Sequence, residues 1–203
     1  MSNITVKQDV VADYAKKYLK RLYDLLENLS SQEIFGVVQA FAEARNNGKT
    51  IFFVGNGGSA ATSSHFSQDL AEVGRKAKAG LFRTHSLTDN TSYITAMGND
   101  YGFETVFSKQ VEQMFREGDV LVAISASGNS KNLIKAVEAA KALKGTTIGI
   151  VGFDGGELKR ICDRVIHVKS EKGEYGPVED VHMILDHLTT CYLMGHLSAK
   201  SAT

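Results

Sequence analysis

Two stretches rich in glycine, serine and asparagine have the composition of an anion-binding turn. "GNGGSA" (55–60) follows the apolar run "TIFFV", and "SASGNS" (125–130) follows "DVLVAI". Free backbone N–H groups and hydroxyls at the start of a helix favour a bound phosphate. A single stretch of this kind is equally well explained as a tight turn with an N-capping serine. Two of them, each after an apolar strand, point to a phosphorylated small molecule, with one loop on the phosphate and the other on sugar hydroxyls.

A dinucleotide site is a competing interpretation of the first stretch. Gly55, Gly57 and Ala60 match the G-x-G-x-x-[GA] pattern. That pattern also needs an acidic residue about 20 positions further on, at the end of the second strand. Position 80 is Gly80, and the second strand runs through "RTHSL" to the first acid at Asp89. The sequence therefore argues against a dinucleotide, and it has no phosphate-loop lysine motif.

Two helices carry side chains that could hold a metal ion or move a proton. His65 and Asp69 are spaced i, i+4, so they share a helix face, as any solvated surface pair also would. Glu179 and His187, on the last helix, are about 12 Å apart along a straight axis, too far to bind one ion together. Either Glu179 lies in a turn after Pro177, or the two serve different roles or different subunits' sites. A second i, i+4 pair on that helix competes with them: His182 and Asp186.

Composition places the chain among ordinary globular proteins. Of its 203 residues, 43% are hydrophobic, and the 23 basic and 23 acidic residues cancel. A balanced charge argues against nucleic-acid or anionic membrane partners. No apolar run approaches the roughly 20 residues of a membrane span, and the N-terminus lacks the pattern of a signal peptide. Cys162 and Cys191 have no metal-type spacing. We therefore expect a cytoplasmic protein.

The elements that must position these side chains alternate along the chain. Alternation of strands and helices predicts a parallel sheet with helices on both faces. We predict a three-layer α/β fold with a five-stranded, flavodoxin-like sheet, in a single domain over 1–203: N-terminal helices in about 1–48, the sheet core in 49–170 and a C-terminal helix in 177–199. The expected strands are 50–55, 80–87, 119–125, 147–153 and 164–168, and the expected core helices are about 59–73, 89–98, 103–116, 130–143 and 155–162.

The two flanking helices, 5–29 and 178–199, each carry an apolar stripe at helical spacing. Such a stripe packs either on its own domain or on another subunit. We favour the subunit.

Four motifs in this order resemble the sugar isomerase (SIS) domain of phosphoheptose isomerases: "GNGGSA", "GNDYGFE" (98–104), "SASGNS" and "EDVHMILDH" (179–187). The resemblance covers roughly residues 5 to 195. It implies an aldose–ketose isomerase that converts sedoheptulose 7-phosphate to D-glycero-D-manno-heptose 7-phosphate through an enediol. It also implies a cytoplasmic homotetramer with its sites between subunits and a zinc ion in each subunit.

The same resemblance assigns roles to individual residues. His65, Asp69, Glu179 and His187 correspond to the family's metal and catalytic positions, which makes all four candidate zinc ligands. Because isomerisation through an enediol needs a base and an acid, our hypothesis gives Asp69 the base role and His187 the acid role. Substrate contacts fall to Asn56, Gly57, Gly58, Ser59, Asn99, Asp100, Ser125, Ala126, Ser127, Ser130 and Glu179, with the three serines of 125–130 on the phosphate.

Three departures from the family pattern affect this expectation. The family usually has glutamate at the position of Asp69, glutamine at that of Glu179, and "STS" where this chain has "SAS". Shortening a catalytic carboxylate by one methylene moves it by about 1 Å, which is enough to slow a reaction severely. A non-catalytic SIS module that senses a sugar phosphate or binds a protein partner, and an isomerase of another phosphosugar, are therefore alternatives.

Overall fold

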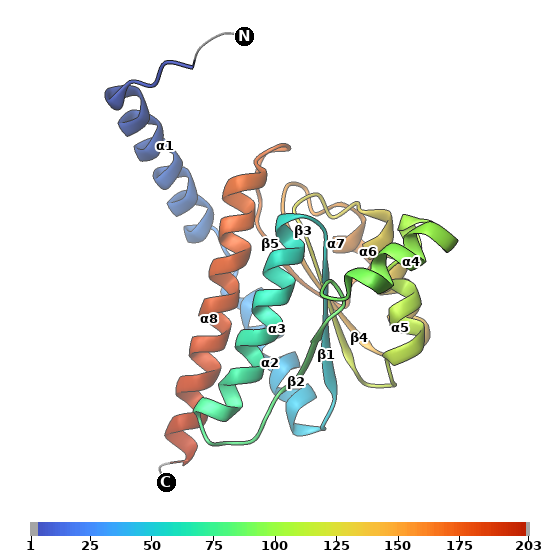
Figure 1. Ribbon diagram of the computed structural model, residues 1–203. Helices are drawn as coiled ribbons and strands as arrows, with labels where there is room; N and C mark the ends of the chain where they lie inside the picture. Colours follow the sequence, from blue (N-terminus) through green and yellow to red (C-terminus); the bar gives the residue numbers. More distant parts are fainter. Residues whose placement is uncertain (1–3, 202–203) are drawn as a thin grey trace.

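Five parallel strands form one sheet in a computed structural model that describes residues 4–201. The sheet order β2-β1-β3-β4-β5 is the flavodoxin-like order that the alternating pattern predicted. Figure 1 shows the sheet between its covering helices. The strands are β1 (Thr50–Gly55), β2 (Arg83–Ser86), β3 (Val120–Ser125), β4 (Thr146–Val151) and β5 (Arg164–His167).

The helices largely follow the predicted segments. The segment 103–116 splits into the short 3-10 helix η1 and α5, and the second strand, predicted over 80–87, keeps four residues because it pairs with only four residues of β1. The helices are α1 (Gln8–Glu27), α2 (Ser31–Asn46), α3 (Gly58–Lys76), α4 (Thr91–Tyr101), η1 (Phe103–Thr105), α5 (Ser108–Met114), α6 (Lys131–Ala142), α7 (Gly156–Ile161) and α8 (Tyr175–Ser201).

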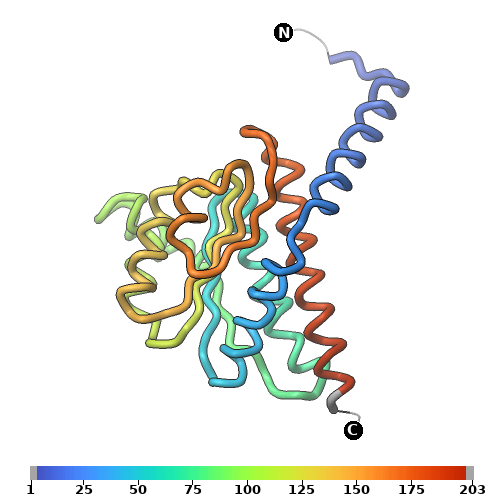
Figure 2. Tube along the Cα trace, turned by 180° about the vertical axis from the view of Figure 1, so that it is seen from behind, coloured from blue at the N-terminus to red at the C-terminus, as the bar shows by residue number. Residues whose placement is uncertain are grey.

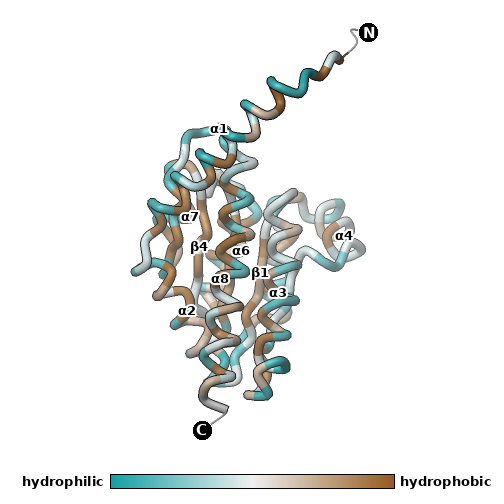
Figure 3. Tube along the Cα trace, turned by 90° about the vertical axis from the view of Figure 1, so that its left-hand side faces the viewer, coloured by the Kyte–Doolittle hydropathy of each residue, from teal (hydrophilic) through white to brown (hydrophobic). Residues whose placement is uncertain are grey.

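Side chains of each strand alternate between two cores, one on each face of the sheet. In β1, Ile51 and Phe53 join the core under α2, α3 and α8, whereas Phe52 and Val54 join the core under α5, α6 and α7. Both sets are buried, which explains why the strand is apolar throughout rather than alternating. Figure 3 shows the hydrophobic strands β1 and β4 behind the more mixed helices.

The apolar stripe of the N-terminal helix packs on its own domain only in part. Leu25, near the end of α1, is buried in the core of the domain, but Val11 and Tyr14 are more than half exposed. Figures 1 and 2 show this first half of α1 leaving the body of the protein. After α1 ends at Glu27, Ser30 begins the next helix: its side chain accepts a hydrogen bond from Glu33 N and so caps α2.

Across residues 4–201, none of the helices combines the length and the apolar composition that a bilayer crossing requires.

Candidate active site

The two anion-binding loops leave the sheet side by side. β1 and β3 are neighbours, with Gly55 paired to Ile124, so the loops that follow them emerge at the same edge. This is the point where the strand order reverses, which is where open α/β sheets bind ligands. Gly57 caps α3 with a φ of +55°, a conformation that glycine adopts without strain.

A pair of amides joins the first loop to the helix of the second. The side-chain nitrogen of Asn56 donates to the Asn132 oxygen at 2.9 Å, and the Asn132 nitrogen donates back at 2.8 Å. Asn132 lies in the first turn of α6 and is 3% exposed. The two loops are therefore fixed relative to each other by side chains as well as by the sheet.

The serine loop combines oriented hydroxyls with a helix N-terminus. Ser125 Oγ accepts from Gly128 N at 3.1 Å, and Ser127 Oγ accepts from Asn129 N at 3.3 Å. Ser130 is the N-cap residue of α6, yet its hydroxyl caps no N–H within the described range. Its hydroxyl and the first N–H groups of the 12-residue helix α6 are therefore available to an anion.

One cavity of about 170 Å³ lies between the loops and α8. The carboxylate of Glu179, from α8, closes it and packs directly on Gly58. A Cβ atom added to Gly58 would lie 2.2 Å from Glu179 Oε2, so only glycine leaves room for this contact. The lining comes from the two loops, the end of β3, the first turns of α3 and α6, and α8: Asn56, Ser59, Ile124, Ser125, Ala126, Ser127, Ser130, Leu133, Tyr175 and Glu179.

A second polar cluster lies between α3 and α8, which run side by side in Figures 1 and 3. Its members are His65, Asp69, Asp186 and His187, whose potential ligand atoms all lie within 4.8 Å of one another. His65 Nε2 is 3.4 Å from Asp69 Oδ2 and 3.3 Å from His187 Nε2, and His187 Nε2 is 4.0 Å from Asp69 Oδ2. Zinc–nitrogen bonds of about 2.0–2.1 Å place tetrahedral donors about 3.3 Å apart. The four residues therefore fit a divalent metal ion.

The competing pair on α8 is not formed. His182 and Asp186 are both fully buried, and within residues 4–201 neither the ring nitrogens nor the carboxylate oxygens have a hydrogen-bond partner. Burial lowers the pKa of His182 to about 4; the backbone of Val151 opposes this shift without forming a hydrogen bond of good geometry. Burial, with the nearby charge of Asp69, raises the pKa of Asp186 to about 7. His182 is therefore a neutral core residue, whereas Asp186 belongs to the cluster.

Three residues assigned by resemblance lie away from their expected partners in this single chain. Pro177 and Glu179 are both inside α8, so no turn brings Glu179 to His187, and Glu179 is not part of the His–Asp cluster. Asn99 and Asp100 lie on α4, bonded to each other at 2.8 Å. Figure 1 shows α4 at the outer side of the sheet, and neither residue lines the 170 Å³ cavity.

Sequence reasoning missed three residues at these sites. Asn132 follows the serine loop, but its partnership with Asn56 depends on the sheet order rather than on local spacing. Tyr175 reaches the cavity because α8 begins before Pro177. Asp186 was considered only as a partner of His182; its position next to His187 was the available signal.

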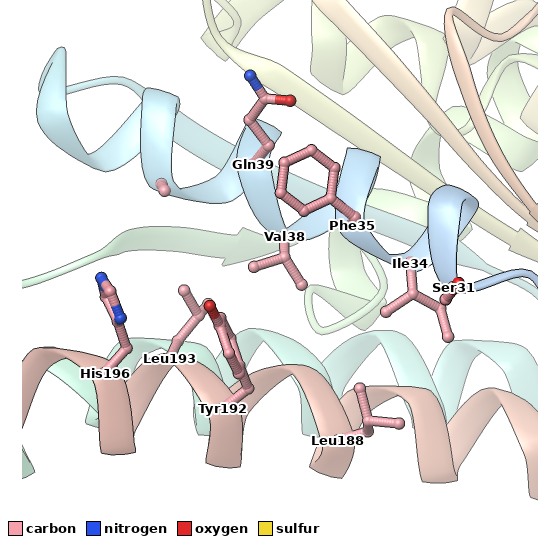
Figure 4. A pocket seen from close by; sticks show the side chains of 10 residues that line it. Ser31, Ile34, Phe35, Val38, Gln39, Leu188, Tyr192, Leu193 and His196 are labelled. Atoms are coloured by element: carbon pink, nitrogen blue, oxygen red, sulfur yellow. The ribbon is translucent and has the colours of Figure 1, made fainter.

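An apolar groove of about 510 Å³ lies between α2 and α8. Figure 4 shows Ile34, Phe35 and Val38 of α2 facing Leu188 and Tyr192 of α8 across it. Phe35 is 63% exposed and Tyr192 is 56% exposed. Large apolar side chains gathered in this way are typical of a surface that another protein covers.

Comparison with known proteins gives consistent matches. The family model for the SIS domain matches residues 13–152. A probable phosphoheptose isomerase of Thermoplasma acidophilum is 38% identical over 174 residues, covering 86% of this chain and 94% of the relative. The phosphoheptose isomerase of Helicobacter pylori is 36% identical, covering 92% and 93%.

Solved structures give the same result. The phosphoheptose isomerase of Neisseria gonorrhoeae superposes with a TM-score of 0.80 at 32% identity, covering 92% of this chain and 97% of that one. The enzyme of Francisella tularensis gives a TM-score of 0.83 at 26% identity, covering 94% and 100%. The sugar isomerase domain of an RpiR transcription factor from Sphaerobacter thermophilus, at 18% identity and a TM-score of 0.68, shares the fold.

Proposed function

We propose that this chain, which belongs to the phosphoheptose isomerase family of SIS-domain proteins, interconverts sedoheptulose 7-phosphate and D-glycero-D-manno-heptose 7-phosphate. The observation that carries the proposal is the arrangement of two sites on α3 and α8. One end of these helices meets the anion-binding loops, and the His–Asp cluster lies further along both of them.

The separation of the two sites agrees with a long sugar phosphate. His65 lies seven residues beyond Gly58, about 10 Å along α3, and His187 lies about 12 Å beyond Glu179 along α8. With its phosphate on Ser125, Ser127 and Ser130, a substrate reaches the cluster only if its carbon chain is extended. Asn56, Ser59 and Glu179 then face the hydroxyls in between.

The cluster is where we place the chemistry at C1 and C2. Zinc is the ion we propose for it, and when bound it supplies a positive charge that polarises the carbonyl oxygen of the sugar. Asp69 directs Oδ2 toward both histidines, which leaves Oδ1 to move the proton between C1 and C2. When zinc is bound, His187 would be one of its ligands. In the metal-free protein, we propose that the His187 imidazole is the acid that protonates the sugar oxygen.

We also propose that the working form is a homotetramer with sites between subunits. The cavity of about 170 Å³ is smaller than the roughly 300–1,000 Å³ of typical small-molecule sites, which agrees with a larger site whose wall is completed by a neighbour. A neighbouring subunit would also explain the positions of Asn99 and Asp100, which lie away from the cavity of their own chain. We propose that these two residues act across an interface, and that Glu179 acts at the sugar or across an interface. The α2–α8 groove and the free half of α1 are the apolar surfaces that such an assembly covers.

The activity is tested by incubating the purified full chain with sedoheptulose 7-phosphate, with and without added Zn²⁺, and following the aldose by NMR. We expect conversion of this substrate, and none of unphosphorylated sedoheptulose. Faster conversion of a pentose phosphate, or no conversion with either metal content, contradicts the proposal.

The assembly is tested separately by light scattering. Phe35→Glu places a charge in the α2–α8 groove and is expected to lower the molecular mass. Leu81→Glu, at a residue that is 59% exposed outside the groove, is the matched control. A wild-type monomer at assay concentration overturns the inter-subunit site.

A further inference from the structure

Asp186 is a buried carboxylate that the packing of the protein does not explain. Its side chain is 0% exposed, and both oxygens lack a hydrogen-bond partner within the described residues. Burying an unpaired carboxylate is expensive, whereas an apolar residue of similar size would fill the same space without that cost. Such a group is stabilised either by a proton or by a positive partner, and no basic side chain among the described residues is bonded to it.

The surroundings of Asp186 indicate what that partner is. No lysine or arginine is bonded to Asp186 in the structure of residues 4–201, and its neighbours are His65, Asp69 and His187. Those three side chains are between 29% and 52% exposed, so they form the outer part of the cluster. Asp186 lies beneath them and supplies a fourth donor on the protein side. Two imidazoles and two carboxylates form a donor set that suits zinc and similar divalent ions.

Glu179, the fourth ligand implied by the family resemblance, is engaged elsewhere. Its carboxylate packs against Gly58 and lines the cavity between the loops. It lies about 12 Å from His187 along the same straight helix, so one chain cannot bring both to one ion. Asp186 immediately precedes His187 and already lies within the cluster.

We propose that Asp186 is the fourth protein ligand of the divalent metal ion, which leaves the Glu179 carboxylate to contact the sugar. The inference rests on the proposed function in one respect, that the His65–Asp69–His187 cluster holds an ion. It adds that each chain completes its own set of ligands, so metal binding does not require a carboxylate from a neighbouring subunit.

The test is zinc affinity of the full chain, measured by competition with a chromophoric chelator after metal removal. Asp186→Asn keeps the shape of the side chain but removes the charge, and we expect it to weaken binding at least about 10–100-fold. Glu179→Ala, which removes the donor atoms altogether, is the matched control on the same helix and is expected within about threefold of the wild type. Unchanged affinity in Asp186→Asn, or an equal loss in Glu179→Ala, overturns the proposal.

Thermal melting provides a second readout that needs no activity. Without metal, Asp186→Leu is expected to melt at or above the wild-type temperature, because it removes an unpaired buried charge. The wild type is expected to gain stability from Zn²⁺, and Asp186→Leu is expected to gain less at the same Zn²⁺ concentration. A full zinc-dependent gain in Asp186→Leu contradicts the assignment.

If neither variant folds, a crystal structure of the wild-type zinc complex decides. An Asp186 oxygen about 2.0–2.2 Å from the ion supports the proposal, and any longer separation overturns it. A wild type that binds no zinc also overturns it, whereas the turnover of sedoheptulose 7-phosphate under the same conditions reports on the proposed function independently.

Discussion

Nε2 of His65 on α3 lies 3.3 Å from Nε2 of His187 on α8. The residues are 122 positions apart in sequence, and the contact forms because α3 and α8 pack against each other on one face of the sheet. Two imidazole nitrogens at this distance share a hydrogen bond only if one is protonated and the other is not. A metal ion between them would instead bind the lone pair of both nitrogens, each in its unprotonated form. Asp69 Oδ2 lies within 4.0 Å of each of these nitrogens.

Asp69→Asn is expected to lower kcat by about 10²–10⁴-fold, because the amide cannot accept the proton from the sugar. The measurement is steady-state turnover of sedoheptulose 7-phosphate at saturating Zn²⁺. Glu117→Gln, at a surface ion pair with Lys144 outside both sites and α1, is the control and should retain wild-type rates. Turnover of Asp69→Asn within about twofold of the wild type would exclude Asp69 as the base.

Gly58→Ala is expected to act through Glu179. The new Cβ would lie 2.2 Å from the Glu179 carboxylate, which can swing away because it ends a flexible side chain. We therefore expect a raised KM with little change in Tm. Gly195→Ala on α8, where nothing lies within 4 Å, is the control. In a Glu179→Ala background, Gly58→Ala should have no further kinetic effect; an additive loss would show that the two residues act independently.

Asn132→Ala is expected to destabilise the protein by about 1–3 kcal/mol, because it leaves the Asn56 amide without its two hydrogen bonds. Urea denaturation measures the free energy of unfolding. Asn56→Ala should cost a similar amount, and the double variant little more than either single one. Fully additive losses would mean that the amide pair does not connect the loops.

His182→Leu is expected to flatten the pH dependence of stability between pH 6.5 and 4. The folded pKa of about 4 lies below the unfolded value of 6.5, so in this window the unfolded chain takes up a proton that the folded chain does not. The free energy of unfolding of the wild type therefore falls as the pH drops, and this residue contributes roughly 3 kcal/mol of the fall. Denaturation at pH 7.5 and 4.5 compares the two proteins, with His85→Gln as an exposed-histidine control. Parallel pH profiles of wild type and His182→Leu would rule out this contribution.

The fold was predictable because its signals are local. Apolar runs such as "FFV" and "VLVAI" indicate strands covered on both faces, and their alternation with helices fixes parallel pairing. The predicted ends of the elements were less accurate. β2 was predicted over 80–87 but covers only Arg83–Ser86, because its ends are set by its pairing with β1, which is distant in sequence. The boundary between α1 and α2 is marked locally only by Ser30, the N-cap residue of α2.

The sites were predictable only in part, because their partners are distant in sequence. The two loops could be paired in advance, since β1 and β3 were expected to end at one edge. The partnership of Asn56 with Asn132, and the contact of Glu179 with Gly58, depend instead on helix positions that no spacing reveals. Asp186 was paired with His182 by the i, i+4 rule, whereas the packing of α8 on α3 turns it toward His65.

The first half of α1 leaves the domain with no tertiary support of its own. From Gln8 to Lys17 every residue is exposed, and the anchoring contacts begin at Tyr18, which donates to Asp180 at 2.5 Å, and at Arg21, which pairs with Glu174. A helical segment this short is marginal in water by itself. In an isolated chain its amide hydrogens should exchange within moments and its backbone should be the first target of a protease. Slow exchange there at micromolar concentration would therefore show that another subunit covers this segment, before any enzyme assay is run.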